Sequence, residues 1–566
     1  MARLGSRFLF FTTSPRTPAK MIPEIQLLAD RFGGKTWNNQ TQNEFITALG
    51  ESSFFEGTGS PSDKAFSVRD RINRAPKALG FIDLTPKIAL TDAGRAFIYG
   101  KRPQEAFLRQ LLKFQLPSPF HIEDKSILGT FYVRPYLEIL RLIRQLEYLT
   151  FDELKIFALQ LTDYRKFDDI AASIRKFRKD KAKYQGNYKQ FADTIWTESI
   201  KRLYHDDIQV GKTKTRETTD SSLDKFIKTK KSNARDYADA CFRYLRYTGL
   251  LSLEQKSRRL QFYADKLQDI DHILATVSRE PVFVSDEKKY KAHLFCSETP
   301  VLYDDSKDNL IVFLQGKGVS SREELMKKNI EELKDLRDSI LQKQLDDVIL
   351  TQIQQLKTFS LYSEIIDTFK ELLDHDIYYD APLMLEYNTW RAMTMLDGGT
   401  IKANLKFDDA GQPLSTAQGN MPDIECDYGD FVLSVEVTMQ HGQRQYETEG
   451  EPVARHYGQF KQSTGKNAYC LFIAPTINPA AFMHFYGLNK LNNVYYGGKT
   501  KIIPIGITQF MKLLSNSFQY LATHKCAPTP KEIKSFLDSV LAKLDVCQDE
   551  NSWKDFIQQS VNQWLI

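Results

Sequence analysis

The sequence has few cysteines and lacks the patterns of zinc-finger, disulfide-rich and membrane proteins. Its six cysteines include no CxxC pair and have no histidine at zinc spacing, so we expect neither a structural zinc nor a disulfide framework, as suits a reduced cytoplasm. No apolar run approaches the roughly 18 to 20 residues that span a bilayer. The apolar run at residues 8–11 is too short for the core of a signal peptide, and we predict that it forms a first strand.

Several motifs of hydrolytic enzymes are also missing. There is no GxSxG, no HExxH and no Walker-type phosphate loop, which argues against the hydrolase classes that these motifs mark. Gly316 and Gly318 lack the spacing of a phosphate loop and predict an ordinary turn. We find no internal repeat of fixed period and no long low-complexity tract.

What the sequence has is length and an uneven distribution of charge. At 566 residues it is too long for one hydrophobic core, so we expect about three or four domains. Residues 165–246 contain 21 Lys and Arg against 12 Asp and Glu, a net charge of +9, whereas the other residues sum to −4. Concentrated positive charge is what a phosphate-contacting surface requires, although a solvated helical face explains it equally well.

Residues 64–98 predict a helix, a small β-hairpin and a second helix. The first strand ends at Ile82, the second runs through Leu90, and the helix that follows is capped by Thr91 or Asp92. A helix followed by a hairpin wing is typical of winged-helix domains. Such domains bind DNA or serve only protein–protein contacts.

A second copy of this pattern runs over residues 233–262. A helix with Tyr237 and Leu245 near its apolar face ends at Gly249, and two short strands follow. Two such units in one chain favour modules that read DNA grooves. Between them, residues 211–235 are polar and basic and predict a loop that becomes ordered on DNA or, equally, a plain flexible connector.

Basic side chains lie where a DNA-reading helix needs them. Arginine suits bidentate contact with guanine edges, whereas lysine mostly contacts phosphate. The predicted DNA-contacting residues are Arg69, Arg71, Arg74, Lys77, Lys212, Lys214, Lys230, Lys231, Arg235, Arg243 and Arg246.

The carboxy-terminal half predicts a helical linker and then an α/β domain. Residues 320–373 are rich in Glu, Lys, Leu, Gln and Ile, with few Gly or Pro, and Ser321 followed by Glu324 predicts a helix start. Residues 380–510 alternate between helix and strand patterns. We therefore expect an α/β fold in this region.

One strand of the α/β region carries an acid in apolar surroundings. In FVLSVEVT (residues 431–438) the side chains alternate, so Glu436 shares a face with Thr438. A buried carboxylate needs a partner, and a divalent cation is a natural one. Asp423, preceded by Pro422, stands thirteen residues earlier, and a hairpin between the two acids can bring them together.

This arrangement resembles that of the PD-(D/E)xK nuclease superfamily, in which two acids and the backbone carbonyl after the second acid hold Mg²⁺. The lysine of that pattern, two residues after the glutamate, is Thr438 here. Glu449 and His456 are seven residues apart, two helical turns, so both can lie on one face of a helix that we predict to begin near Pro452. Either could replace the missing lysine.

The segment GNMPDIECDYGDFVLSVEVTMQHGQRQYETEGEPVARHY resembles the cleavage core of the AlwI-like type IIS restriction endonucleases, a family that includes a nicking enzyme. The resemblance covers nearly the whole chain, through LEYNTW (385–390), YCLFIAP (469–475), AFSVRDR (65–71), NARD and ADA (233–240) and RYTGL (246–250). It implies a multidomain protein made of two winged-helix α+β DNA-recognition domains, a helical linker and an α/β PD-(D/E)xK nuclease domain. Their expected bounds are 1–130, 131–300, 301–373 and 374–566.

The resemblance also implies which residues carry the chemistry. The catalytic residues would be Asp423, Glu436, Glu449, His456 and Glu386, and the Mg²⁺ ligands would be Asp423, Glu436 and the carbonyl of Val437. Glu386 is a supporting acid in this scheme, and Glu449 with His456 stands in for the lysine. An acidified water attacks phosphorus in line, and His456 orients or deprotonates it.

The expected function is therefore cleavage of double-stranded DNA a few nucleotides outside a short asymmetric site. One catalytic centre per chain predicts a monomer that nicks first, with a transient homodimer or a small catalytic partner subunit needed for the second strand. A cognate DNA methyltransferase would complete the restriction system. The alternatives are a DNA repair or junction-resolving nuclease and a non-catalytic winged-helix regulator.

Overall fold

The computed structural model describes residues 2–52, 54, 71–215, 217–374, 377–396, 398–417 and 421–566. The chain divides into two compact units, Met1–Glu51 with Ser60–Arg337 and Ser52–Gly59 with Asp338–Ile566. The boundary falls inside residues 301–373, the segment predicted as a linker. In the described part of the chain, no helix combines the length and the apolarity that crossing a membrane requires.

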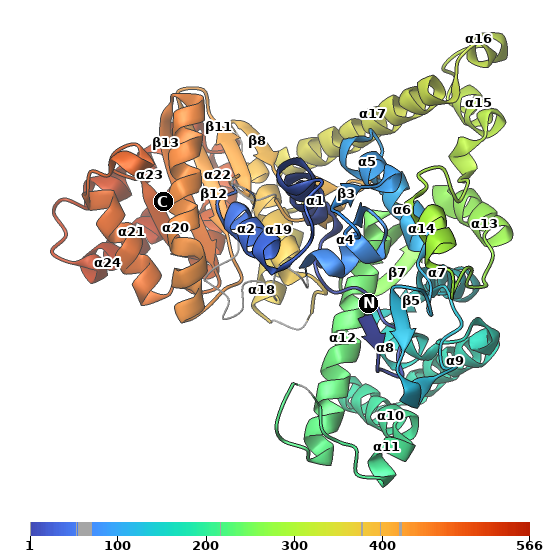
Figure 1. Ribbon diagram of the computed structural model, residues 1–566. Coiled ribbons are helices and arrows are strands. Elements are labelled where there is room, and N and C mark those ends of the chain that lie inside the picture. Colours follow the sequence, from blue (N-terminus) through green and yellow to red (C-terminus); the bar gives the residue numbers. More distant parts are fainter. Residues whose placement is uncertain are drawn as a thin grey trace. The chain divides into compact units, whose positions relative to one another are not determined.

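The first unit is mostly helical, with short strands (Figure 1). Its helices are α1 (Pro18–Phe32), α2 (Asn39–Gly50), α4 (Ala75–Ala78), α5 (Asp92–Tyr99), α6 (Pro103–Lys113), α7 (Pro135–Leu146), α8 (Phe151–Ile156), α9 (Phe167–Lys183), α10 (Tyr188–Leu203), α11 (His205–Gln209), α12 (Leu223–Tyr247), α13 (Leu267–Thr276), α14 (Glu287–Phe295), α15 (Lys307–Gly316), α16 (Arg322–Met326) and the start of α17 (Ile330–Lys357). Its strands are β1 (Ala2–Leu4), β2 (Ile82–Asp83), β3 (Ala89–Leu90), β4 (His121–Glu123), β5 (Tyr148–Thr150), β6 (Leu251–Glu254) and β7 (Arg259–Phe262).

Both predicted hairpins are present. β2 pairs antiparallel with β3, and α5 follows Thr91, whose hydroxyl accepts a hydrogen bond from the Gly94 N–H. In the second segment Gly249 has a φ of 74°, which ends α12 because side chains disfavour that conformation. β6 and β7 then pair antiparallel, and β5 adds a third strand. The part of the first predicted helix that precedes residue 71 lies outside the described residues.

Two local predictions for this unit are wrong. The first strand is β1, which pairs with β4, whereas Phe8, Leu9 and Phe11 are buried without belonging to a strand. Apolar side chains can thus be buried without a sheet ladder. The predicted loop at 211–235 ends much earlier than expected, because α12 begins at Leu223 and buries Phe226 beneath its charged surface.

The segment predicted as a linker is helical but packs into both units. At the start of α17, Lys334 and Arg337 form ion pairs with Glu105 of α6. Further along, Leu356 of α17 and Phe369 of α18 belong to the hydrophobic core of the second unit. The unit boundary therefore crosses one continuous helix.

The second unit is an α/β domain. Its strands are β8 (Thr400–Ala403), β9 (Lys406–Phe407), β10 (Pro413–Ser415), β11 (Ile424–Asp427), β12 (Phe431–Val437), β13 (Asn467–Ala474) and β14 (Ile502–Gly506). Its helices are the rest of α17, α18 (Tyr362–Leu373), α19 (Ala381–Leu396), α20 (Gln443–Thr464), α21 (Pro479–Lys490), α22 (Ile507–His524), α23 (Pro530–Ala542) and α24 (Glu550–Gln563).

A five-stranded mixed sheet forms the centre of this unit, in the order β14-β13-β12-β11-β8 (Figure 1). β12, β13 and β14 are parallel, and β11 runs antiparallel to both of its neighbours. One face packs on α20 and α21 through residues such as Tyr457 and Phe485. The other face packs on α18, α19 and α22 to α24, through Trp390, Phe510 and Trp553 among others. Helices on both faces explain why the central strands are apolar throughout.

β12 presents its two faces to different cores, as its alternation predicts. Leu433 and Val435 belong to the larger core, whereas Val432 belongs to the core under α20. Glu436 therefore lies on the α20 side of the sheet. Gly429, with a φ of 87°, makes the turn between β11 and β12.

Candidate active site

The hairpin of β11 and β12 brings the two predicted metal-binding acids to one place. Ile424 pairs with Val435, so Asp423 lies next to Glu436 across the hairpin. The N–H of Val437 donates a hydrogen bond of 2.7 Å to Asp423 Oδ2. One carboxylate oxygen of Asp423 is thereby fixed beside the peptide that joins Glu436 to Val437.

Helix α20 adds Glu449 and His456 to the same end of β12. Thr438 Oγ1 donates to Glu449 Oε1 at 2.9 Å, and His456 Nδ1 lies in hydrogen-bond contact with Glu436 Oε1 at 3.1 Å. The seven-residue spacing does place both side chains on the face of the helix that meets the strand. The start of that helix was mispredicted, because α20 begins at Gln443 and Pro452 lies inside it.

Glu386 reaches the site from a third element, α19. Its side chain is 7% exposed, and its Oε2 accepts a hydrogen bond of 3.0 Å from the Ala417 N–H. Its charge acts on Glu436, fifty residues further along the chain. The structure therefore brings all five predicted catalytic residues into one neighbourhood.

The electrostatics of this neighbourhood centre on Glu436. Burial raises the pKa of Glu436 well above its usual value, and the negative charges of Glu449 and Glu386 raise it further, whereas Arg455 lowers it. The carboxylates of Glu436, Glu449 and Glu386 thus lie near one another in a buried site, where Arg455 supplies a compensating positive charge. Such a surplus of negative charge is what a divalent cation relieves.

The set of side chains that could bind a cation here is small. Within the described ranges, no three His, Cys, Asp or Glu side chains form a ready metal-ligand cluster. Two carboxylates, from Asp423 and Glu436, lie beside the backbone of Val437. Mg²⁺ is commonly held by one or two carboxylates and keeps several waters, so this limited set suits it.

Two residues that contact or act on the predicted acids were missed by the sequence reasoning. Thr438, noted only as a missing lysine, holds Glu449 through its hydroxyl. Arg455 is a positive charge that acts on Glu436 and lowers its pKa. Arg455 directly precedes His456 in the sequence. Consecutive residues of a helix point in different directions, so this position gave no reason to predict that Arg455 acts on Glu436.

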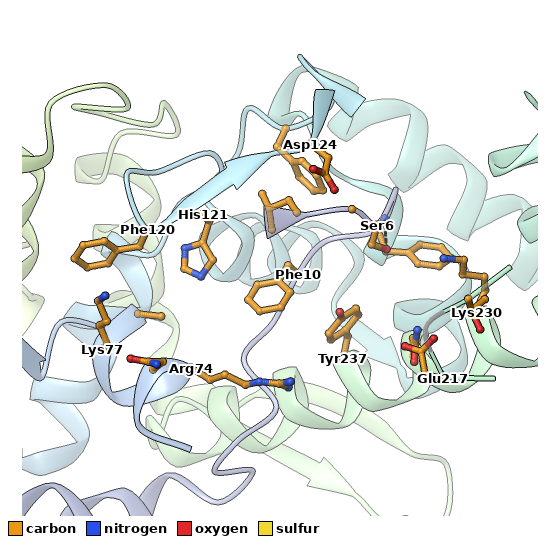
Figure 2. A pocket seen from close by; sticks show the side chains of 18 of the residues that line it. Ser6, Phe10, Arg74, Lys77, Phe120, His121, Asp124, Glu217, Lys230 and Tyr237 are labelled. Carbon is orange, nitrogen blue, oxygen red and sulfur yellow. Dashed lines mark hydrogen bonds between the residues drawn. The ribbon is translucent and has the colours of Figure 1, made fainter. Parts of the chain in front are cut away.

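The predicted DNA-contacting residues separate into two groups. Four of them, Arg74, Lys77, Lys214 and Lys230, line one cavity of about 740 Å³ in the first unit (Figure 2). They come from α4, from the segment before α12 and from α12 itself. Residues far apart in sequence thus share one basic recess.

The other residues lie outside this cavity. Lys212 and Arg235 are exposed, and Arg69 falls outside the described residues. Several of the remaining side chains are engaged in the protein: Arg71 with Glu24, Lys231 with Asp193 and Thr197, and Arg243 with Asp239. Arg246 is only 6% exposed, which argues against direct base contact, because the packed end of α12 covers it.

Comparison with known proteins adds a family match that spans both units. The model of the AlwI restriction endonuclease family matches residues 77–513, a range that contains all five predicted catalytic residues. No curated protein matches the chain.

Three solved structures are similar over parts or most of the chain. The small subunit of the heterodimeric restriction endonuclease R.BspD6I is 25% identical and aligns over 35% of this chain and 98% of its own, with a TM-score of 0.30. The BpuJ1 endonuclease binding domain, solved with pyrene- and phenanthrene-modified DNA, is 13% identical over 51% of this chain and 97% of its own, with a TM-score of 0.33. FokI is 12% identical over 94% of this chain and 99% of its own, with a TM-score of 0.22.

Proposed function

The chain belongs to the AlwI restriction endonuclease family, and from this premise we propose that it is a Mg²⁺-dependent type IIS or nicking endonuclease. It would hydrolyse a DNA phosphodiester bond a few nucleotides outside a short asymmetric site. Its family makes it a site-specific nuclease that acts on DNA. The observation that carries the proposed active site is the meeting of Asp423, Glu436, Glu449 and His456 at the end of β12.

We assign cation binding to Asp423, Glu436 and the carbonyl of Val437. The hydrogen bond from the Val437 N–H holds one oxygen of Asp423 beside the peptide that joins Glu436 to Val437. When bound, Mg²⁺ supplies Lewis-acid chemistry, since it stabilises negative charge on the phosphate and lowers the pKa of water. Glu386 and Glu449 add the negative charge that favours a cation here.

His456 is the proposed proton acceptor. In the tautomer that donates from Nδ1 to Glu436, Nε2 would be the ring nitrogen that accepts a proton from the attacking water. Glu436 fixes the ring orientation through this bond. Glu449, held by Thr438, orients the same water or supports the positive charge that forms on the imidazole.

DNA reading is assigned to the first unit. The two segments with a helix and a hairpin are the proposed winged-helix modules, and the basic cavity collects side chains from both. Phosphate contacts from lysines supply affinity, whereas arginines supply base selection. The reading and cutting functions are then carried by different units of the chain.

The test of this proposal is plasmid cleavage by isosteric variants. Glu436→Gln and Asp423→Asn should abolish cleavage in Mg²⁺ buffer while binding of site-containing duplex stays nearly unchanged. Run-off sequencing of both strands of the wild-type product gives the site, the offset and the number of strands cut. Glu425→Gln is the matched control, because Glu425 belongs to the same hairpin but bonds to Asn404.

Cleavage that survives Glu436→Gln would contradict the site assignment. Equal loss in the Glu425→Gln control would mean that the hairpin, and not the cluster, had been disturbed. Cleavage without any sequence preference would favour the alternative of a repair or junction-resolving nuclease.

A further inference from the structure

The cavity in the first unit is lined by aromatic side chains as well as by basic ones. It is lined by the N-terminal segment around Phe10, by α4, by residues before α12 and by α12 itself. Figure 2 shows the ring of Phe10 in the middle of the cavity, with His121 on one side and Tyr237 on the other. Its volume of about 740 Å³ lies in the range of small-molecule sites, roughly 300 to 1,000 Å³.

The aromatic rings in this cavity are not stacked face to face. Phe10 and Tyr237 meet edge to face, with ring centroids 5.7 Å apart and planes at 66°. Phe10 and His121 are tilted at 45°, with centroids 5.4 Å apart. Phe10 and Tyr237 are both half-buried, so part of each ring surface remains accessible from the cavity. An accessible ring surface beside cations is what protein sites offer to an unpaired base.

The charges of the lining favour an anionic ligand. Four cations, Arg74, Lys77, Lys214 and Lys230, are opposed by two acids, Asp124 and Glu217. His121 adds no charge at neutral pH, because burial lowers its pKa to about 3. The Lys77 ammonium lies 5.2 Å from the Phe120 ring centroid, which keeps this cation at the cavity wall.

A buried hydroxyl supplies an independent sign of a missing ligand. Thr215 lines the cavity, and its Oγ1 is buried with no hydrogen-bond partner among the described residues. A buried polar atom without a partner costs stability, so such atoms usually meet a ligand or an ordered water. A base edge or a phosphate oxygen would satisfy it.

We propose that this cavity accepts one nucleotide that is unstacked from the bound DNA. Its base lies against Phe10 and Tyr237, its phosphate faces the lysines of the rim, and Thr215 bonds to the base edge or the phosphate. A base inside a duplex has both faces covered by its neighbours, so contact with these rings requires a nucleotide outside the helix. The proposal rests on the proposed function, because it takes DNA as the ligand.

The test uses the full chain and a duplex that contains the site found by run-off sequencing. 2-Aminopurine replaces one base at a time across the site and its flanks, and fluorescence is recorded on binding in EDTA, where no strand is cut. One position should brighten several-fold, because 2-aminopurine is quenched while stacked in a duplex. Phe10→Leu and Tyr237→Leu should change this signal at that position alone.

Polar variants keep the test independent of the aromatic packing. Thr215→Val and Lys214→Gln should weaken binding of the duplex and reduce the bright signal. Lys228→Gln is the matched control, since Lys228 is exposed on α12 two residues before Lys230 and does not line the cavity. Thermal melting confirms that each variant is folded.

Two outcomes would overturn the proposal. One is a chain that cuts its site while 2-aminopurine stays dark at every position. The other is a bright position that is unchanged by Phe10→Leu, Tyr237→Leu and Thr215→Val. A chain that cuts no DNA at all would instead refute the proposed function, so the two failures are distinguishable.

Discussion

At the scale of single residues, the acids of the candidate active site are oriented by hydrogen-bonding neighbours. A backbone N–H holds Asp423, the hydroxyl of Thr438 holds Glu449, and an imidazole meets Glu436. Thr438 is a neighbour that the sequence pattern did not mark as catalytic, whereas His456 is one that it did. Replacement of these neighbours tests the site while all of its carboxylates stay in place.

His456 is the first of these tests. Loss of a general base typically costs about 10²- to 10⁴-fold in rate, so His456→Ala should slow single-turnover nicking by this factor. His456→Lys should recover part of the activity, because lysine occupies this role in the pattern that the site resembles. His484→Ala is the control, since His484 is a half-buried histidine of the same unit that contacts Tyr446. Equal rates for His456→Ala and wild type would exclude the role.

His121 predicts how the stability of the first unit depends on pH. Burial lowers its pKa to about 3, whereas an unfolded histidine titrates near 6.5. Between these pH values the histidine is protonated in the unfolded state but not in the folded state. The free energy of unfolding therefore falls as pH falls, by up to about 1.4 kcal/mol per pH unit. The contribution is fully present above pH 6.5 and is lost toward pH 3.

The measurement is urea unfolding of wild type and His121→Phe at pH 7, 6 and 5. Phenylalanine keeps a ring against Phe10 and Phe114 but cannot titrate. The stability of the variant should fall less steeply with acid than that of wild type. Identical pH slopes would show that His121 is protonated in the folded protein.

At the scale of elements, the start of α17 is fixed by an ion network on α6. Lys334, whose side chain is 4% exposed, lies 2.8 Å from Glu105 and 2.7 Å from Asp305. Asp305 also pairs with Arg109, and despite burial its cationic partners lower its pKa to about 2. Lys334 therefore lies between two partly buried carboxylates, each of which also pairs with an arginine: Glu105 with Arg337 and Asp305 with Arg109.

Lys334→Met is the variant that tests this network. Breaking a buried ion pair costs up to about 3 to 5 kcal/mol, and the cost here should fall at the lower end, because Arg337 and Arg109 still pair with the two carboxylates. Lys343→Met is the control on the same helix, where Lys343 is exposed, and it should change the free energy of unfolding by less than about 0.5 kcal/mol. Both are measured by urea unfolding. Similar costs for the two variants would mean that the network contributes nothing specific.

At the scale of the whole molecule, the boundary between the units determines where the protein can be truncated to give a folded fragment. Residues after 300 complete the first unit, because Asp305 pairs with Arg109 and Lys334 pairs with Glu105. A fragment that ends near residue 345 should fold and bind the cognate duplex without cutting it, with affinity that falls steeply as salt rises. A fragment that ends at residue 300 should unfold at lower urea concentration. Specific binding by the carboxy-terminal fragment alone would contradict this division of labour.

The number of catalytic centres predicts the order of strand cleavage. Residues 373–566 contain one Pro-Asp…Glu set, and a single centre cuts one strand at a time. Nicked circles should therefore accumulate before linear plasmid, with the second step rising more than linearly with enzyme concentration if two chains must meet. Linear product from the first turnover, with a dimer seen by light scattering without DNA, would contradict this expectation.

Sequence alone determined the local features of this protein. Period-two alternation predicted the two faces of β12, Gly429 and Gly249 predicted turns, and the order of motifs predicted the family that the family model then matched. These signals work because strand alternation, helix spacing and backbone freedom of glycine are properties of neighbouring residues.

Only the tertiary structure decided which distant side chains meet. It brought Glu386 to Glu436, made Arg455 the cation beside that acid, buried Arg246, and joined Phe10, Arg74 and Tyr237 in one cavity. The start of α20 and the extent of α12 were also mispredicted. Packing tolerates Pro452 inside α20 and buries Phe226 of α12. Local patterns cannot contain this information, since the charge that a residue experiences depends on the elements that pack against it and not on its neighbours in sequence.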